Sequence, residues 1–237
     1  MLVAAAVCPH PPLLVPEIGG AKRADLDGLR AACAGAIEAV LATEPEMLVV
    51  VGAGETTRRH HAGARGTFRA YGVDLTVALR GEAPPNEEPL LPLSLSVGAW
   101  LLERAAWTGD VQAQEVAAST PAEECRQLGL ALAESADRLA LLVMGDGTAG
   151  SSANGPGAHD PRAADFDASV VEALRAADPS ALLAIDATLA AELSVAGRVS
   201  WQVLAGAAGE AVLDAEVLYD GAPYGVRYVV AVWERHG

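Results

Sequence analysis

The chain has 237 residues and a formal net charge of -15, from 31 acidic and 16 basic residues. This balance argues against a general nucleic-acid binder, which needs a basic face to displace counterions from phosphates, and it disfavours binding to an anionic membrane surface. Hydrophobic residues make up 51% of the sequence, so the composition predicts a folded protein with a substantial core.

Three features of the sequence bear on the cellular compartment of the protein. No apolar segment approaches the length of a membrane span, and the first apolar run is too short for a secretory signal. The three cysteines, Cys8, Cys33 and Cys125, are an odd number without CxxC spacing. This pattern indicates neither a disulfide framework nor a zinc knuckle. We therefore expect a cytoplasmic protein.

Strand and helix patterns alternate along the chain. An apolar run over residues 2–7 stops at Pro9 and its neighbours, and reads as a buried strand because proline has no N–H for a sheet ladder. Further strands are expected at 47–51, 73–79, 111–117, 139–144, and in a terminal antiparallel hairpin at 212–219 and 226–233. Helices are expected at 21–43, 93–107, 120–136, 163–176, 187–195 and 201–208.

Loops connect these elements. Residues 52–66 and the Gly-rich segment 145–157 are expected to be loops. The sequence Thr120-Pro121-Ala122-Glu123 predicts a capping box at a helix start. With no repeat and no linker, the order predicts a single α/β domain over residues 1–237, a sandwich with a central mixed β-sheet flanked by helices.

Four of the five histidines follow predicted strands. His10 follows the first strand, His60 and His61 the second, and His159 the strand ending at Met144. Loops at strand ends can converge on one pocket at the sheet edge. Two imidazoles and a carboxylate there would hold non-haem Fe(II), and a further histidine could exchange protons. The nearby carboxylates are Glu17, Glu55, Asp146 and Asp160.

Each histidine also has a plainer interpretation. His10, in a stiff proline-rich loop, can be a structural hydrogen-bonding residue. The sequence Arg58-Arg59-His60-His61 can be a solvated loop. The third segment, His159-Asp160-Pro161, can be a helix entry in which the aspartate accepts a capping hydrogen bond.

Four segments together resemble a known superfamily. They are AAVCPHPPLLVPEIGG, LLVMGDGTAG, AGRVSWQVLAGAAG and YDGAPYGVRYVVAVW, and they span nearly the whole chain. In this order they resemble the class III extradiol ring-cleaving dioxygenases, a superfamily that includes the catalytic B chains of these enzymes and the Memo-type proteins. The resemblance implies the α/β fold of those catalytic chains and, in active members, an Fe(II) site that inserts O₂ beside a catecholic ring diol.

The resemblance also implies roles for individual residues. It matches His10 to the first metal ligand, His60 or His61 to the second, and His159 to the catalytic histidine. The third ligand, a carboxylate or a cysteine, aligns with Ala196, which has no donor atom. The metal site is therefore incomplete by this alignment.

Two functions stay open on these grounds. The chain is either an extradiol dioxygenase with a rearranged third ligand, or a protein that keeps the fold and binds a small molecule or acts as a scaffold without redox activity. The expected cofactor is Fe(II), with zinc or no metal as alternatives. The expected partner is a small-molecule substrate, aromatic if the chain is a dioxygenase. The edge strand of the terminal hairpin would present unpaired N–H and C=O groups that need to be covered. Pairing with a second copy of the chain, in a homo-oligomer, is compatible with this need.

Overall fold

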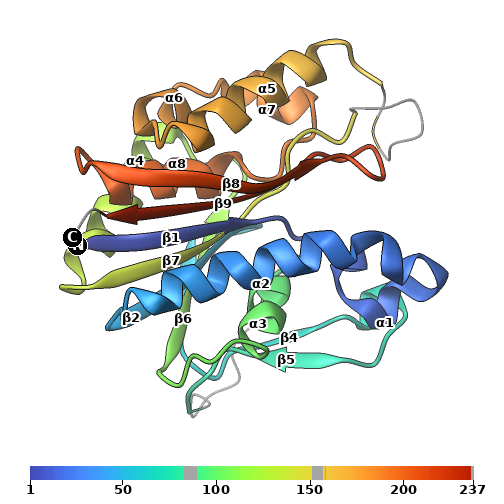
Figure 1. Ribbon diagram of the computed structural model, residues 1–237, viewed down its shortest axis with the longest axis horizontal. Coiled ribbons are helices and arrows are strands. Elements are labelled where there is room, and N and C mark those ends of the chain that lie inside the picture. Colours follow the sequence, from blue (N-terminus) through green and yellow to red (C-terminus); the bar gives the residue numbers. More distant parts are fainter. Residues whose placement is uncertain (83–89, 151–156, 158, 236–237) are drawn as a thin grey trace.

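A computed structural model of the chain describes residues 1–82, 90–150, 157 and 159–235. Its centre is a seven-stranded mixed sheet with the order β3-β6-β2-β7-β1-β9-β8 (Figure 1). The strands are β1 (Leu2–Cys8), β2 (Met47–Gly54), β3 (Arg58–His60), β6 (Val111–Ala117), β7 (Leu139–Met144), β8 (Leu213–Gly221) and β9 (Tyr228–Arg235). The predicted single α/β domain with a mixed sheet flanked by helices is confirmed.

The four central strands, β6, β2, β7 and β1, are parallel, and β3, β9 and β8 pair antiparallel at the two sides. Every residue of β1 and of β7 is buried. A parallel sheet that is covered on both faces needs apolar side chains pointing both ways. This explains why these strands are continuous apolar runs in the sequence.

Two layers of helices cover the sheet, one below and one above in Figure 1. The lower layer holds α2 (Asp27–Ala42) and α3 (Leu93–Leu102), whose buried side chains share one core with Ala4, Ala6 and Cys8 of β1. The upper layer packs on the other side of the sheet. It holds α4 (Ala122–Glu134), α5 (Arg162–Arg175), α6 (Pro179–Leu183), α7 (Ala187–Glu192) and α8 (Arg198–Ala208).

Smaller elements lie beside the lower layer. The short helix α1 (Pro16–Gly19) is flanked by 3₁₀ turns at Pro12–Leu14 and Gly20–Leu26, and a third 3₁₀ turn covers Arg69–Tyr71. The strands β4 (Arg65–Thr67) and β5 (Thr76–Ala78) form a separate two-stranded sheet.

The structure corrects several predicted boundaries. The expected loop 52–66 instead contains the end of β2, the edge strand β3 and the first two residues of β4. The expected strand 73–79 shortens to β5 and lies outside the main sheet. Short strands of three residues carry too little periodicity to be seen in a sequence. None of the described helices combines the length and apolar character of a membrane-spanning helix.

Two helix starts also differ from expectation. The capping box at Thr120 is wrong: α4 begins after Pro121 without a side-chain cap, and Thr120 Oγ1 lies 3.1 Å from Thr57 Oγ1. Helix α6 is absent from the sequence-based prediction, although Asp178 accepts a hydrogen bond from Ala181 N–H at 3.0 Å and Pro179 opens the helix. An aspartate followed by proline is the signal that could have located it.

Candidate functional site

The chain leaves β1 and β7 toward opposite faces of the sheet. From β1 it continues into α2 in the lower layer, and from β7 it continues into α5 in the upper layer. Adjacent parallel strands whose connections diverge in this way open a crevice at their carboxyl ends, where ligands of open α/β sheets bind. The topology therefore places the candidate site at the carboxyl ends of β1 and β7.

His10 and Asp146 lie side by side at these strand ends. Cys8 pairs with Met144 in the parallel ladder, so the residues two positions further on lie level with each other. Asp146 Oδ1 accepts the backbone N–H of His10 at 2.7 Å and lies 3.7 Å from His10 Nδ1. Only 9% of the His10 side chain and 14% of the Asp146 side chain is exposed.

The segment after β7 is fixed by hydrogen bonds to four neighbouring elements. Gly145 N–H donates to Cys8 O at the end of β1, and Gly147 N–H donates to Arg227 O just before β9. Asp146 O accepts the N–H of Gly197, next to α8, and Thr148 donates twice to the Asp167 carboxylate in α5. The first part of the Gly-rich segment is therefore rigid and holds Asp146 in place; residues 151–156 and 158 lie outside the described residues.

Glycine is required in this segment by close packing. A Cβ on Gly145 would lie 2.7 Å from the Cα of Gly197 and 2.8 Å from Trp201 Nε1. A Cβ on Gly147 would lie 2.7 Å from the Cβ of Arg227. The Gly145-Asp146-Gly147 sequence thus brings α8 and the start of β9 against the site.

A buried tyrosine completes the row of side chains across the edge. Ala231 of β9 pairs with Val7 of β1, which sets Tyr228 level with His10. Burial raises the pKa of Tyr228 well above its ordinary value, and the neighbouring Asp146 charge adds to this. Burial also raises the pKa of Asp146, and the His10 charge and N–H oppose that shift. The row combines an imidazole, a carboxyl group and a phenol.

Unpartnered buried polar atoms gather on the segments that meet here. Within the described part of the chain, five buried side-chain nitrogens or oxygens have no hydrogen-bond partner. Four of them belong to the end of β1, the first turn of α8 and the residue before β9: His10 Nδ1, Ser200 Oγ, Trp201 Nε1 and Arg227 Nε. Such atoms are rare in native structures, and each needs an explanation, of which a bound water, ion or ligand is one.

His60 lies elsewhere. The ladder sets it level with Ala6 of β1 but four strands away, along the row Ala6, Leu142, Val50, Ala113 and His60. At roughly 4.8 Å per strand, this row is about 19 Å wide. His10 lies four residues beyond Ala6 toward the carboxyl edge. One metal ion cannot bind both imidazoles, so the expected convergence of these two loops is corrected.

The reason for this separation is the path of the chain after β2. The chain turns back and forms β3 antiparallel to β6, so it runs away from the carboxyl edge. His60 is buried and its Nε2 lies 2.9 Å from Glu115 Oε2. His61 follows β3 and is exposed. Neither position brings an imidazole to His10.

His159 is exposed just before α5. Its neighbour Asp160 accepts the N–H of Arg162 at 2.9 Å and pairs with the same side chain at 2.7 Å. The guanidinium of Arg162 holds the pKa of Asp160 at about 2. These contacts fit the helix-entry interpretation of this segment, and the catalytic role of His159 stays a prediction.

The donor set does not fit the expected iron site. Among the described residues, no group of three His, Cys, Asp or Glu side chains could hold a metal ion. His10 and Asp146 supply one imidazole and one carboxylate, while Ala196, at the aligned third position, has no donor atom. A facial triad needs two imidazoles and a carboxylate around one ion. The roles of His10, His60 and His61 as ligands therefore stay predictions.

Comparison with known proteins adds the fold alone. No family model matches the chain, and no curated protein matches its sequence. The structure is similar to that of the uncharacterized protein JW3007 from Escherichia coli K12, with a TM-score of 0.50 and 14% sequence identity over 98% of this chain and 99% of that chain. The two chains share an architecture over their whole length.

The sequence reveals only part of this site. It identifies His10 and Asp146 as candidates because each follows a strand end. It does not reveal Tyr228, Trp201 and Arg227, since their positions depend on β9 and α8 folding back onto the carboxyl edge. A usable signal for Tyr228 is its place at the start of the last apolar strand, directly after a Gly-rich turn.

Proposed function

We propose that this chain binds a small hydroxyl-bearing organic molecule at the carboxyl ends of β1 and β7, and that His10 exchanges a proton with it. The observation that carries the proposal is the buried, unpartnered Nδ1 of His10 beside the carboxylate of Asp146. At 3.7 Å between Nδ1 and Oδ1 the two side chains are not hydrogen-bonded. The nitrogen thus remains available to a ligand.

The energetics favour a ligand hydroxyl at this position. A buried nitrogen without a partner costs the fold about 1–3 kcal/mol. A hydroxyl can donate to a neutral imidazole and so recover part of this cost. If the proton then moves to His10, the adjacent Asp146 carboxylate stabilises the imidazolium that forms. The pair is suited to general acid–base chemistry.

Fe(II)-dependent cleavage of a catecholic ring is the second candidate function. One observation favours it: His10 lies at the end of β1, where the resemblance places the first metal ligand. The remaining ligands would have to come from residues other than His60, since that side chain lies four strands away and contacts Glu115. This requirement makes the acid–base site the better-supported proposal.

One experiment separates the two candidates. Metal-stripped protein is titrated with catechol and, as a non-aromatic diol, with trans-1,2-cyclohexanediol, while NMR follows the His10 imidazole. We expect the His10 resonances to shift, and affinity to fall about tenfold or more in His10→Ala. The matched control is His61→Ala, which removes an exposed imidazole and is expected to leave binding unchanged.

The second arm restores the metal. Fe(II) is added anaerobically to the catechol complex, O₂ is admitted, and a yellow ring-opened product is sought. Binding without product supports the acid–base proposal. Product that disappears in His10→Ala establishes the dioxygenase instead, and the absence of any His10 shift with both diols would overturn the acid–base proposal.

A further inference from the structure

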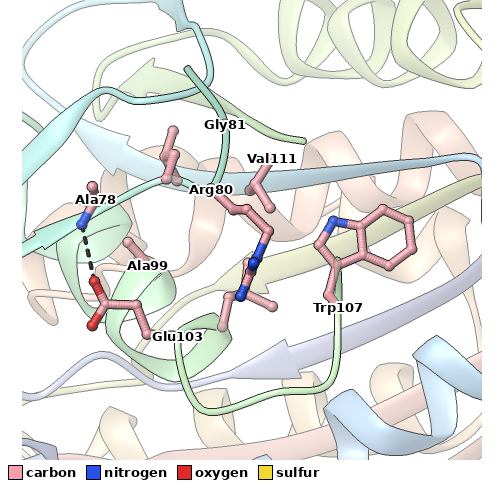
Figure 2. Close-up of a pocket in the computed structure, with 9 residues that line it drawn as sticks. Ala78, Arg80, Gly81, Ala99, Glu103, Trp107 and Val111 are labelled. Carbon is pink, nitrogen blue, oxygen red and sulfur yellow. Dashed lines mark hydrogen bonds between the residues drawn. The ribbon is translucent and has the colours of Figure 1, made fainter. Parts of the chain in front are cut away.

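A cavity lies at the opposite end of the sheet from His10. It has a volume of about 250 Å³ and lies where β6 begins, next to the end of β5 and the last turn of α3 (Figure 2). Its residue Val111 is the first of β6 and pairs with Leu48 near the start of β2, which places the cavity at the amino edge. It is therefore separate from the site proposed above.

The floor of the cavity is apolar, and one wall is a fixed indole ring. Leu79, Ala99, Leu102 and Val111 line the floor and are almost fully buried. Trp107 Nε1 donates to Asp110 O at 3.3 Å, and a Cβ on Gly109 would lie 2.7 Å from Trp107 Cζ2. The glycine thus lets the backbone pack against the ring. The cavity is shaped to take an apolar group.

Two opposite charges line the same cavity without pairing with each other. Glu103 Oε1 accepts the N–H of Ala78 at 3.1 Å, and Figure 2 shows the carboxylate turned toward that N–H. Its Oε2 lies 3.9 Å from Arg104 Nη1, a long ion pair between two partly exposed side chains. The Arg80 backbone is held because its carbonyl accepts the Val111 N–H. In the described part of the chain, no ion pair or hydrogen bond engages the Arg80 guanidinium, and in Figure 2 this side chain lies between Glu103 and Trp107.

We infer that this cavity binds a free L-amino acid with an apolar side chain. Arg80 would take the carboxylate, Glu103 the ammonium group, and the floor beneath Trp107 the side chain. A zwitterion matches one charge of each sign, whereas a simple anion would also be repelled by the net charge of -15. The volume suits a ligand of this size: cavities of about 150 Å³ bind benzene, and drug-sized ligands need about 300–1,000 Å³.

The test uses L-leucine and two analogues that share its apolar body. These are 3-methylbutylamine, which lacks the carboxylate, and 4-methylpentanoate, which lacks the ammonium group. Calorimetry measures affinity, and NMR follows the indole N–H of Trp107, assigned with Trp107→Phe. We expect L-leucine to bind and to shift this resonance, with each analogue weaker by about tenfold or more because a charge-assisted hydrogen bond is lost.

Two variants test the charged and the apolar parts of the site separately. Arg80→Gln removes the cation and is expected to weaken L-leucine binding about tenfold or more, while Ala99→Leu fills the floor and blocks it. The control Arg69→Gln removes an exposed arginine that pairs with Asp74 and leaves binding unchanged; thermal unfolding checks that each variant folds. Analogues that bind as tightly as L-leucine, affinity that Arg80→Gln leaves unchanged, or the absence of binding by valine, leucine, methionine and phenylalanine would each overturn the inference.

Discussion

Two carboxylates with little exposed surface each lie beside a histidine, and their surroundings differ sharply: Glu115 is buried, and 14% of the Asp146 side chain is exposed. At the β3 edge, Glu115 Oε1 accepts the N–H groups of Glu55 and Thr56 at 3.0 and 3.1 Å. Its Oε2 accepts Arg58 Nε at 2.8 Å and His60 Nε2 at 2.9 Å. At the carboxyl edge, the described residues give Asp146 one such donor, the N–H of His10.

This difference separates a structural carboxylate from a candidate functional one. Burial alone would raise the pKa of Glu115, but hydrogen bonds from His60, Thr56 N–H and Arg58 outweigh it and hold the pKa below its ordinary value. For Asp146, burial prevails and the pKa is raised. A carboxylate with four donors stabilises the fold, whereas one with a single donor is left to interact with something else.

The largest expected effect is at Glu115. Replacing it with alanine leaves His60, Arg58 and two backbone N–H groups without their acceptor, so we expect the free energy of unfolding to fall by about 3–5 kcal/mol. Urea unfolding at neutral pH measures this loss. The control is Glu123→Ala, which removes an exposed pair with Arg126 and should cost far less. Equal losses in both variants would show that Glu115 does not stabilise the fold as its contacts indicate.

The two regions differ in how much of them can be predicted from the sequence, for a physical reason. The central strands are long apolar runs, so their order along the chain and the positions of His10 and Asp146 at strand ends could be predicted. The turn back into β3 depends on Gly54, where a Cβ would lie 2.3 Å from Glu115 Oε1. That contact joins residues far apart in the chain. The sequence gives no local signal of this contact. His60 was therefore expected at the carboxyl edge beside His10, whereas it lies in the edge strand β3.

A smaller loss of stability is expected when the close packing that holds Asp146 in place is disturbed. Gly145→Ala introduces a Cβ 2.7 Å from the Cα of Gly197 and 2.8 Å from Trp201 Nε1. Such overpacking should cost about 1–3 kcal/mol and displace Asp146, which would weaken diol binding at His10. Gly35→Ala is the matched control: a Cβ there meets nothing within 4 Å, and alanine inside α2 should stabilise by up to about 1 kcal/mol. Unchanged stability and binding in Gly145→Ala would mean that the close packing does not fix the site.

The stability of the fold at acid pH tests the role of Glu115 by itself. Because its pKa is lower in the folded chain than in the unfolded chain, Glu115 stabilises the fold above the ordinary carboxyl pKa of 4.5, and this contribution is lost as the pH falls through the folded value. In Glu115→Gln, the free energy of unfolding should therefore decrease less than in the wild type as the pH is lowered. The measurement is the midpoint of urea unfolding from neutral pH down to acid. Parallel curves for the wild type and the variant would contradict the assignment.

The contribution of Asp146 to stability should change with pH in the direction opposite to that of Glu115. This is the smallest of the expected effects. Its pKa is raised above the ordinary 3.8 in the folded chain, so protonation favours the fold, and stability falls as the pH rises through the folded value. Asp146→Asn keeps an acceptor for His10 N–H and removes the charge, so at neutral pH the free energy of unfolding should stay level or rise. The gain should vanish at acid pH, where the wild-type carboxyl group is also neutral. Diol binding at His10 should weaken, because the imidazole loses the charge beside it. A variant that loses both stability and binding would place Asp146 with Glu115 as a structural residue, whereas a stable variant with weakened binding is the signature of a charge kept for function.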